Sequence, residues 1–419
     1  MSADLDAQAP RPRQWMVLAV LAVAMLVQLL PLVTGIVGDR SDSLFGDELG
    51  YWELAGGKLW SFLRPPGYPL VVRALRTVTG GTPLALFWVQ SLVTAMAPAF
   101  VLLLAWEAGV RSRTALLVAG VGSALSLTAI SISKRVLADS LLASILLLAV
   151  LWLVRSRRKG TGERLLRSGL LAGAALLLKP IAQLWLVLAP VALLAGSWRG
   201  RRLLRGILLA CLPMVGLLGV GALVNLSRYG VASFSGIGAL AVVRYWAPAT
   251  EGLRETGGHW DTGYFQRLRD EKWTPHDVFS DATELHEFKL FQERALTLLR
   301  SEPFWATRAL MGAAWRNLPR PYFAQECFFW RGAPPWRVLG GKILTYLLWL
   351  TAAVGAIRGL RAEPSRPVAT VSLACAVAFG IATAISWSEG ARLMFPVEWT
   401  LFVFLAIALD RAKGSAAAT

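Results

Sequence analysis

Long apolar runs recur along the chain and restrict its fold more than any other feature of the sequence. A run of about 20 apolar residues is long enough for a helix to span a bilayer. Only 16% of the 419 residues are charged, against about 25% in an ordinary soluble domain. We therefore predict an all-α polytopic membrane protein with about ten (9–12) transmembrane helices. The predicted spans are 15–37, 83–106, 114–131, 138–154, 168–178 with 181–196 after a break, 206–224, 343–360, 367–386 and 393–409.

The basic residues are distributed unevenly between alternate short loops. One set of loops, together with both chain ends, holds 19 Lys and Arg residues, whereas the short loops on the opposite side hold 4. The positive-inside rule therefore predicts that both termini are cytoplasmic, in a multi-pass protein of the cytoplasmic (inner) membrane. Loop anchoring also accounts for the net charge of +17, so we expect the lipid bilayer and no nucleic acid as a partner.

These boundaries divide the chain into five parts. Residues 1–14 and 411–419 are predicted cytoplasmic tails. Residues 15–224 form a transmembrane module that includes an outer segment at 38–82, and residues 343–410 form the C-terminal transmembrane helices. Residues 225–342 form a second outer segment with interfacial helices.

Both outer segments are predicted to contain short helices at the membrane surface. In the first, apolar and charged residues alternate at helical spacing over 47–62 and 70–78, and a proline-rich stretch separates them,. In the second, we expect helices over 281–300 and 301–318. The second of these should turn an apolar face of Trp305, Leu310, Met311 and Trp315 away from Arg308 and Arg316.

Several ionisable residues lie at the outer ends of the predicted spans. Charges near hydrocarbon are costly and often functional. Cations gathered at one interface would hold a lipid phosphate, and a carboxylate beside them would accept a proton from a hydroxyl. Boundary residues that extend into the headgroups would give the same pattern. The residues are Asp47, Glu48, Lys134, Arg135, Asp139, Lys179, Glu389 and Arg392.

Five short motifs occur in order on this predicted outer face. They are Gly46–Ala55, Arg64-Pro65-Pro66, Arg135–Asp139, Leu178-Lys179-Pro180 and Ala391–Pro396. Together they resemble elements of the GT-C superfamily of membrane glycosyltransferases, in the branch of protein O-mannosyltransferases and aminoarabinose transferases. Arg64 replaces the lysine that this branch has before its two prolines.

The resemblance implies the GT-C fold and a glycosyltransferase activity. A single sugar would pass, with inversion, from a polyprenyl-phosphate carrier to a hydroxyl of an extracytoplasmic acceptor, which is a lipid, a glycan or a protein. The implied catalytic residues are Asp47, Glu48 and Asp139, with Asp47 as the general base and Glu48 as the alternative base. The implied lipid-phosphate ligands are Arg64, Arg135, Lys179 and Arg392. Tyr51 and Tyr68 are assigned to the substrate pocket.

Three further questions stay open at this point. No cofactor is certain, and a divalent ion held by Asp47 and Asp139 is left open. A transporter or flippase of a lipid-linked or anionic substrate would also carry charges at the membrane, although no inverted repeat is visible in the sequence. A non-catalytic subunit of an envelope-assembly complex would need no reactive carboxylate.

Overall fold

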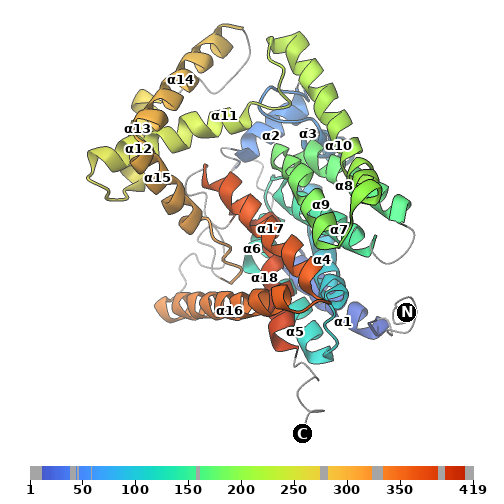
Figure 1. Cartoon of the computed structure of the whole chain (residues 1–419). Coiled ribbons are helices and arrows are strands. Elements are labelled where there is room, and N and C mark those ends of the chain that lie inside the picture. Colours follow the sequence, from blue (N-terminus) through green and yellow to red (C-terminus); the bar gives the residue numbers. More distant parts are fainter. Residues whose placement is uncertain are drawn as a thin grey trace.

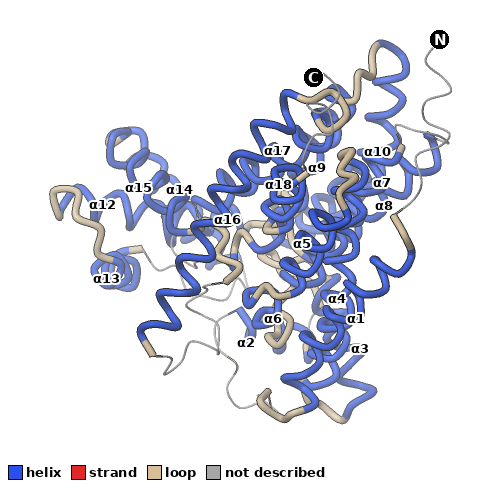
Figure 2. Tube along the Cα trace, turned by 90° about the horizontal axis from the view of Figure 1, so that it is seen from below, coloured by secondary structure: helices blue, strands red, loops and turns tan. Residues whose placement is uncertain are grey.

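The computed structural model describes residues 12–37, 44, 47–57, 59–156, 161–273, 282–322, 334–385 and 392–410. Every regular element in these ranges is a helix, which confirms the predicted all-α class (Figures 1 and 2). Six helices are long and apolar enough to cross a membrane, by length and composition. They are α1 (Gln14–Val33), α4 (Leu84–Glu107), α5 with α6 (Arg113–Ala124 and Leu127–Ile132), α10 (Gly200–Tyr229), α16 (Pro335–Arg361) and α17 (Arg366–Ala384).

Four further helices fall on the remaining predicted spans. They are α7 (Asp139–Arg155), α8 (Thr161–Leu178), α9 (Trp185–Ala195), which follows the short turn η2 (Pro180–Leu184), and α18 (Trp399–Leu409), which follows η6 (Phe395–Val397). Each apolar run of the sequence therefore forms a helix, and the chain is a multi-pass membrane protein. Several helices continue beyond the apolar run into basic residues, because arginine side chains can reach headgroup level from the end of a span.

The fraction of a helix surface that is buried indicates whether the helix lies inside the bundle or at its edge. α7 is buried on nearly all sides by α4 and α8, with Leu142, Leu147 and Val150 in the core. By contrast, only 22% of the apolar window of α10 and 28% of that of α16 are buried. A helix that is apolar all round is either buried in protein or surrounded by lipid. α10 and α16 therefore turn most of their surface to the bilayer.

The third predicted span differs from a straight helix. α5 ends at Ala124, and Ser126 caps the separate helix α6 by accepting a hydrogen bond from the Ala129 amide at 3.1 Å. The hydroxyl of Ser126 also donates to the buried carboxylate of Glu398. The break arises because a serine at this position satisfies helix-end amides that an apolar residue would leave without partners.

The first predicted outer segment contains the two expected short helices. α2 (Asp47–Gly56) and α3 (Gly67–Thr79) pack against each other on either side of the proline-rich stretch. Arg73 and Arg76 of α3 bind carbonyl groups of α2, at 2.7 Å from the Ala55 oxygen and 2.8 Å from the Trp52 oxygen. These contacts fix α2, and with it the acidic residues at its start.

The second predicted outer segment forms a group of helices beside the bundle (Figures 1 and 2). It comprises α11 (Ile237–Ala241), η3 (Val242–Trp246), α12 (Ala247–Glu255), α13 (Thr262–Lys272), α14 (Ala282–Ser301) and α15 (Pro303–Arg316). The two helices predicted over 281–300 and 301–318 are thus confirmed, although residue 281 lies outside the described residues. Leu253, Phe265 and Ala313 belong to the small apolar core of this group.

The apolar face predicted for α15 is wrong in detail. The exposed large apolar residues of this helix are Phe304, Met311 and Trp315, and Arg308 lies on the same side rather than on the opposite one. Trp305 is half-buried and packs beside Phe304. The helix buries its alanines instead, because small residues allow close packing against α12,.

Candidate functional site

Five of the predicted site residues meet in one chain of ion pairs. Arg64 Nη2 donates to Asp47 Oδ1 at 2.7 Å, and Arg392 Nη2 donates to Asp47 Oδ2 at 2.7 Å. Arg392 Nε lies 3.5 Å from Asp139 Oδ2, and Lys179 Nζ donates to Asp139 Oδ1 at 2.7 Å. Residues far apart in the sequence thus form a single group, which we call the ion-pair cluster.

Four of the five members of the ion-pair cluster lie at or close to the end of a helix, and Arg64 lies in the proline-rich stretch between α2 and α3. Asp47 and Asp139 occupy the first turns of α2 and α7, where a carboxylate interacts favourably with the helix dipole. Lys179 follows the last residue of α8 and has an extended backbone, because Pro180 disfavours a helical conformation at the preceding residue,. Arg392 precedes η6. Helix ends therefore bring charged side chains together at one end of the bundle.

Glu48 lies beside Asp47 in the sequence but belongs to a different pair. Its carboxylate is buried and accepts hydrogen bonds from Arg135 Nη2 at 3.0 Å and from the Val136 amide at 3.1 Å. Adjacent residues on a helix point in directions about 100° apart. Glu48 and Arg135 therefore connect α2 to the loop before α7, and Arg135 points to Glu48 rather than into the ion-pair cluster.

The two predicted pocket tyrosines pack against each other, and one of them contacts the cluster. Tyr51 contacts it directly, because the guanidinium carbon of Arg64 is 4.8 Å from the centre of the Tyr51 ring. Tyr68 packs edge-on against Tyr51 with ring centres 4.8 Å apart, and its hydroxyl donates to Gln90 Oε1 at 2.9 Å. Tyr68 is fully buried, so it supports Tyr51 and has no exposed surface of its own.

Charge and exposure distinguish the two carboxylates of the cluster. Among the described residues of the cluster, three cations face two carboxylates, which leaves one positive charge in excess. The Asp47 side chain is 36% exposed and the Asp139 side chain 1%. Burial raises the pKa of Asp47, but the charges of Arg392 and Arg64 outweigh it and hold that pKa well below its ordinary value of 3.8. Asp47 is thus an accessible, fully ionised group, whereas Asp139 holds the cations in place from behind.

The cluster does not fit a divalent metal ion. No group of three His, Cys, Asp or Glu side chains with suitable spacing occurs in the described parts of the chain. The oxygens of Asp47 and Asp139 that would bind a cation already face Arg64, Arg392 and Lys179. Those positive charges oppose a further cation at the same place, so the described residues of the cluster do not form a site for a divalent ion.

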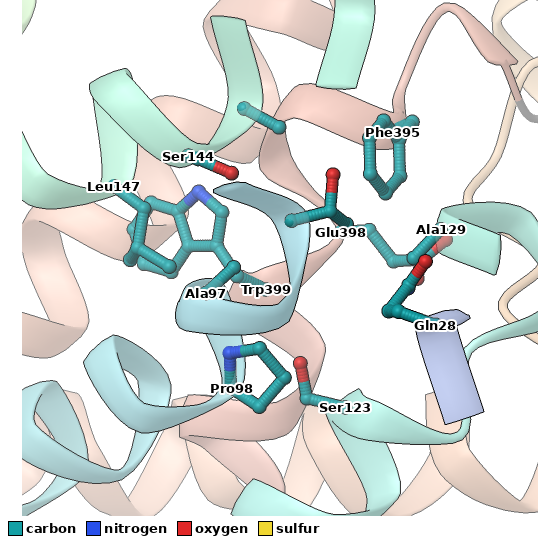
Figure 3. Close-up of a pocket in the computed structure, with 12 residues that line it drawn as sticks. Gln28, Ala97, Pro98, Ser123, Ala129, Ser144, Leu147, Phe395, Glu398 and Trp399 are labelled. Atoms are coloured by element: carbon teal, nitrogen blue, oxygen red, sulfur yellow. The ribbon is translucent and has the colours of Figure 1, made fainter. Parts of the chain in front are cut away.

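A second polar region, not assigned from the sequence, lies inside the bundle. A small cavity is lined by Gln28, Thr94 and Glu398, among other residues (Figure 3). Its volume is about 30 Å³, counted as the space that the centre of a water molecule can occupy. Glu398 Oε2 and Thr94 Oγ1 have no hydrogen-bond partner in the described structure, and a space of this size holds one or two water molecules. An ionisable residue within an apolar run is the signal that would have identified Glu398.

Gln28 connects this cavity to the region behind the site. Its Oε1 accepts hydrogen bonds from Lys134 Nζ at 2.8 Å and from Ser133 Oγ at 2.9 Å. Burial lowers the pKa of Lys134 to about 7. Lys134, singled out by sequence as a charge at a span end, therefore packs against α1 instead of joining the ion-pair cluster.

Comparison with known proteins identifies the fold. No family model and no curated protein matches the sequence. The oligosaccharyltransferase AglB from Archaeoglobus fulgidus, in complex with an inhibitory peptide and a dolichol-phosphate, matches with a TM-score of 0.53 at 15% identity, over 94% of this chain and 50% of that one. The same enzyme tethered to an acceptor peptide gives 0.54 at 16% identity, over 94% and 49%.

A third solved structure is more distant. ArnT from Cupriavidus metallidurans, bound to undecaprenyl phosphate, gives a TM-score of 0.42 at 16% identity, over 96% of this chain and 61% of that one. This score is too low to support an argument about topology.

The AglB matches and the all-helical bundle together define the class: the chain is a multi-pass membrane protein with the GT-C fold. It spans about half the length of the AglB chains that it matches. The fold expected from the five motifs is thereby confirmed, while the particular branch of the superfamily stays a prediction.

Proposed function

We propose that this protein is a membrane glycosyltransferase that moves a single sugar from a polyprenyl-phosphate carrier to an acceptor hydroxyl. The observation that carries the proposal is the ion-pair cluster at the end of a GT-C bundle. Its excess cation and its accessible carboxylate are the groups that such a transfer requires. The AglB structure of the same fold is in complex with a dolichol-phosphate, which supports a lipid phosphate as the carrier.

The donor phosphate would bind where Arg64 and Arg392 now hold Asp47. Both guanidinium groups are 2.7 Å from the Asp47 oxygens, and arginine binds phosphate and carboxylate with similar geometry. A phosphate that takes over one or both arginines releases Asp47 from its ion pairs. Its pKa then rises, because the charges that lower it are now shared with the donor.

Asp47 would then act as the general base. The acceptor hydroxyl attacks the anomeric carbon, the bond from that carbon to the phosphate oxygen breaks, and the hydroxyl proton passes to Asp47. Attack from the face opposite the phosphate inverts the anomeric centre. Glu48 is the weaker candidate because its carboxylate is buried against Arg135, and Asp139 is almost completely buried.

The cations would stabilise the leaving group. Negative charge grows on the phosphate oxygen as its bond to the sugar breaks, and positive groups fixed in advance favour this state most strongly. Asp139 acts as a positioning residue, since it holds Lys179 at 2.7 Å and lies 3.5 Å from Arg392 Nε. Arg135, which is paired with Glu48, holds the α2 end of the site in place.

We place the site on the extracytoplasmic face of the cytoplasmic membrane, from the 19-to-4 distribution of basic residues,. Single cysteines at positions 160 and 260, in a background without the native cysteines, test this placement in intact cells. An impermeant maleimide should label position 260 and not position 160. Labelling of position 160 alone would place the cluster in the cytoplasm and refute the use of an extracytoplasmic acceptor.

The activity itself is tested with purified protein in nanodiscs. We expect polyprenyl-phosphate sugars, offered as a panel, to yield free lipid phosphate and a glycosylated acceptor. Arg392→Ala should abolish this release, whereas Arg167→Ala, which removes an exposed arginine paired with Glu163 on α8, should retain most of it. Release that is equal in wild type and Arg392→Ala would refute the assignment of the cluster.

A further inference from the structure

α15 buries its small residues and exposes its large ones. Ala306, Ala309 and Ala313 are buried against the neighbouring helices. Phe304, Met311 and Trp315 are 66%, 69% and 67% exposed. At 100° per residue these three side chains lie within about 40° of one another, opposite the alanines. We call them the α15 stripe.

The α15 stripe is continuous with a surface that faces lipid. Trp315 lies beside Trp349 of α16 with ring centres 6.5 Å apart, and Trp349 Nε1 donates to the Pro319 oxygen at 2.8 Å. α16 in turn exposes apolar residues along its length, including Ile343 and Leu350. A large, contiguous apolar surface marks an interaction with an apolar partner, and the partner of α16 is the bilayer.

α15 also ends at the level of the ion-pair cluster. Asn317, directly after α15, donates from Nδ2 to the Thr383 oxygen at 2.9 Å. Thr383 is the penultimate residue of α17, and its Oγ1 donates to Sδ of Met394, two residues after Arg392, at 3.4 Å. The α15 stripe therefore lies near the membrane boundary on the side of the bundle that carries the cluster.

Three arginines lie on α15 or shortly after it and carry charge suited to lipid phosphates, and only Arg308 of the three belongs to the face of the stripe. Arg308 lies within the stripe and donates from Nη2 to the Gly258 oxygen at 2.9 Å. Arg316 lies 4.7 Å from the centre of the Trp260 ring. Partial burial and the nearby charge of Arg320 lower the pKa of Arg316. No carboxylate in the described part of the chain forms an ion pair with these arginines, and an anionic partner would relieve the repulsion between Arg316 and Arg320,.

We propose that α15 is an interfacial membrane helix. The α15 stripe enters the acyl-chain region of the leaflet on the side of the ion-pair cluster, and Arg308, Arg316 and Arg320 bind phosphates of phospholipid headgroups. Basic residues with aromatic and apolar residues on one helix are typical of such elements. The bilayer would thereby hold α12–α15 beside the site. This inference does not depend on the reaction that the site performs.

Nitroxide labels in nanodiscs test the proposal without any activity measurement. In a full-length variant with Cys211, Cys327 and Cys375 replaced, a label is attached at position 311, and in a matched control at the exposed Gln266 of α13. Collision rates with oxygen, which concentrates in lipid, are compared with those of a nickel chelate, which stays in water. We expect position 311 to favour oxygen and position 266 to favour the chelate.

Other results at position 311 would overturn the proposal. A label that collides preferentially with the chelate would show that the stripe faces water. A label shielded from both reagents would show that protein covers the stripe, either a second copy or another partner. Labels at positions 304 and 315 repeat the measurement, so that a single variant that fails to fold does not leave the proposal without a test.

Discussion

Replacing Asp47 by asparagine should slow transfer and at the same time tighten binding of the lipid phosphate. Asparagine keeps the size of the side chain and removes its charge. In the structure, Asp47 occupies both Arg64 and Arg392 at 2.7 Å, so it competes with any phosphate for these two groups. A variant that merely damaged the site would weaken binding and turnover together. The opposite signs of the two expected effects make the experiment informative.

The magnitudes follow from the two roles. Loss of a general base lowers turnover by about 10²- to 10⁴-fold. A hydrogen bond to a charged group contributes about 1.5–3 kcal/mol, whereas an exposed ion pair contributes about 0–1 kcal/mol. Because the Asp47 side chain is 36% exposed, we assign a value between these two ranges, about 1.4 kcal/mol, to the free energy by which Asp47 opposes phosphate binding. The affinity for lipid phosphate should then rise about tenfold.

The assay measures both quantities on the same nanodisc preparation. Titration calorimetry with a short polyprenyl phosphate gives the affinity, and release of lipid phosphate from the donor gives the turnover. Glu53→Gln, which removes an exposed carboxylate from the same helix, is the matched control and should change neither. Weaker binding in Asp47→Asn, or turnover within tenfold of wild type, would refute the reasoning.

Three further substitutions test the surroundings of the cluster. Arg392→Lys keeps the charge but replaces a guanidinium that contacts Asp47 and Asp139 through two different nitrogens with a single ammonium nitrogen. We expect at least tenfold weaker lipid-phosphate binding, and affinity equal to wild type would show that charge alone suffices. Glu48→Gln removes the buried carboxylate that pairs with Arg135, so the free energy of unfolding should fall by about 3 kcal/mol, as measured by thermal melting, while turnover of the folded fraction should fall much less than in Asp47→Asn. Lys134→Met removes a buried amine. In the wild type, burial lowers the pKa of this amine to about 7. Between pH 7 and the ordinary pKa of 10.5 the unfolded chain binds more protons, so the stability of the wild type should rise with pH in this range, and the melting temperature of Lys134→Met should lack that rise.

Much of the membrane architecture could be predicted because lipid imposes a simple rule on sequence. Every run of apolar residues near the required length forms a helix, since backbone polar groups have no other partner in hydrocarbon. The charged ends of these runs were also informative. Arg64, Lys179 and Arg392 are costly at a membrane boundary without partners, and the structure pairs each of them with a carboxylate.

The choice of partners could not be predicted from the sequence. Asp47 and Glu48 are adjacent and chemically similar, and only the rotation of α2 directs one to the cluster and the other to Arg135. Tyr68 carries no signal that it is buried, because its partner Gln90 lies in a different helix. These outcomes depend on packing between elements that are distant in sequence.

The orientation of α15 was misjudged for a related reason. The expectation that its apolar side excludes Arg308 rests on a contrast between water and a protein core, and this contrast is absent where a helix borders lipid, as we propose for α15. In such a helix, alanines pack against the neighbouring protein helices, and phenylalanine and tryptophan side chains can face the lipid,. Sequence periodicity locates such a helix but does not identify which of its faces meets protein.

The excess positive charge of the ion-pair cluster has a consequence for the end of the catalytic cycle. Under the proposed function, the donor is a phosphodiester with one negative charge, whereas the carrier left after transfer is a monoester with nearly two at pH 7. Three cations against two carboxylates therefore retain the spent carrier more strongly than they attract a fresh one. Departure of the spent carrier, rather than formation of the glycosidic bond, would then limit the steady-state rate, and accumulated lipid phosphate would act as a competitive inhibitor. Flux through the protein would depend on whatever process removes or recycles that lipid from the membrane.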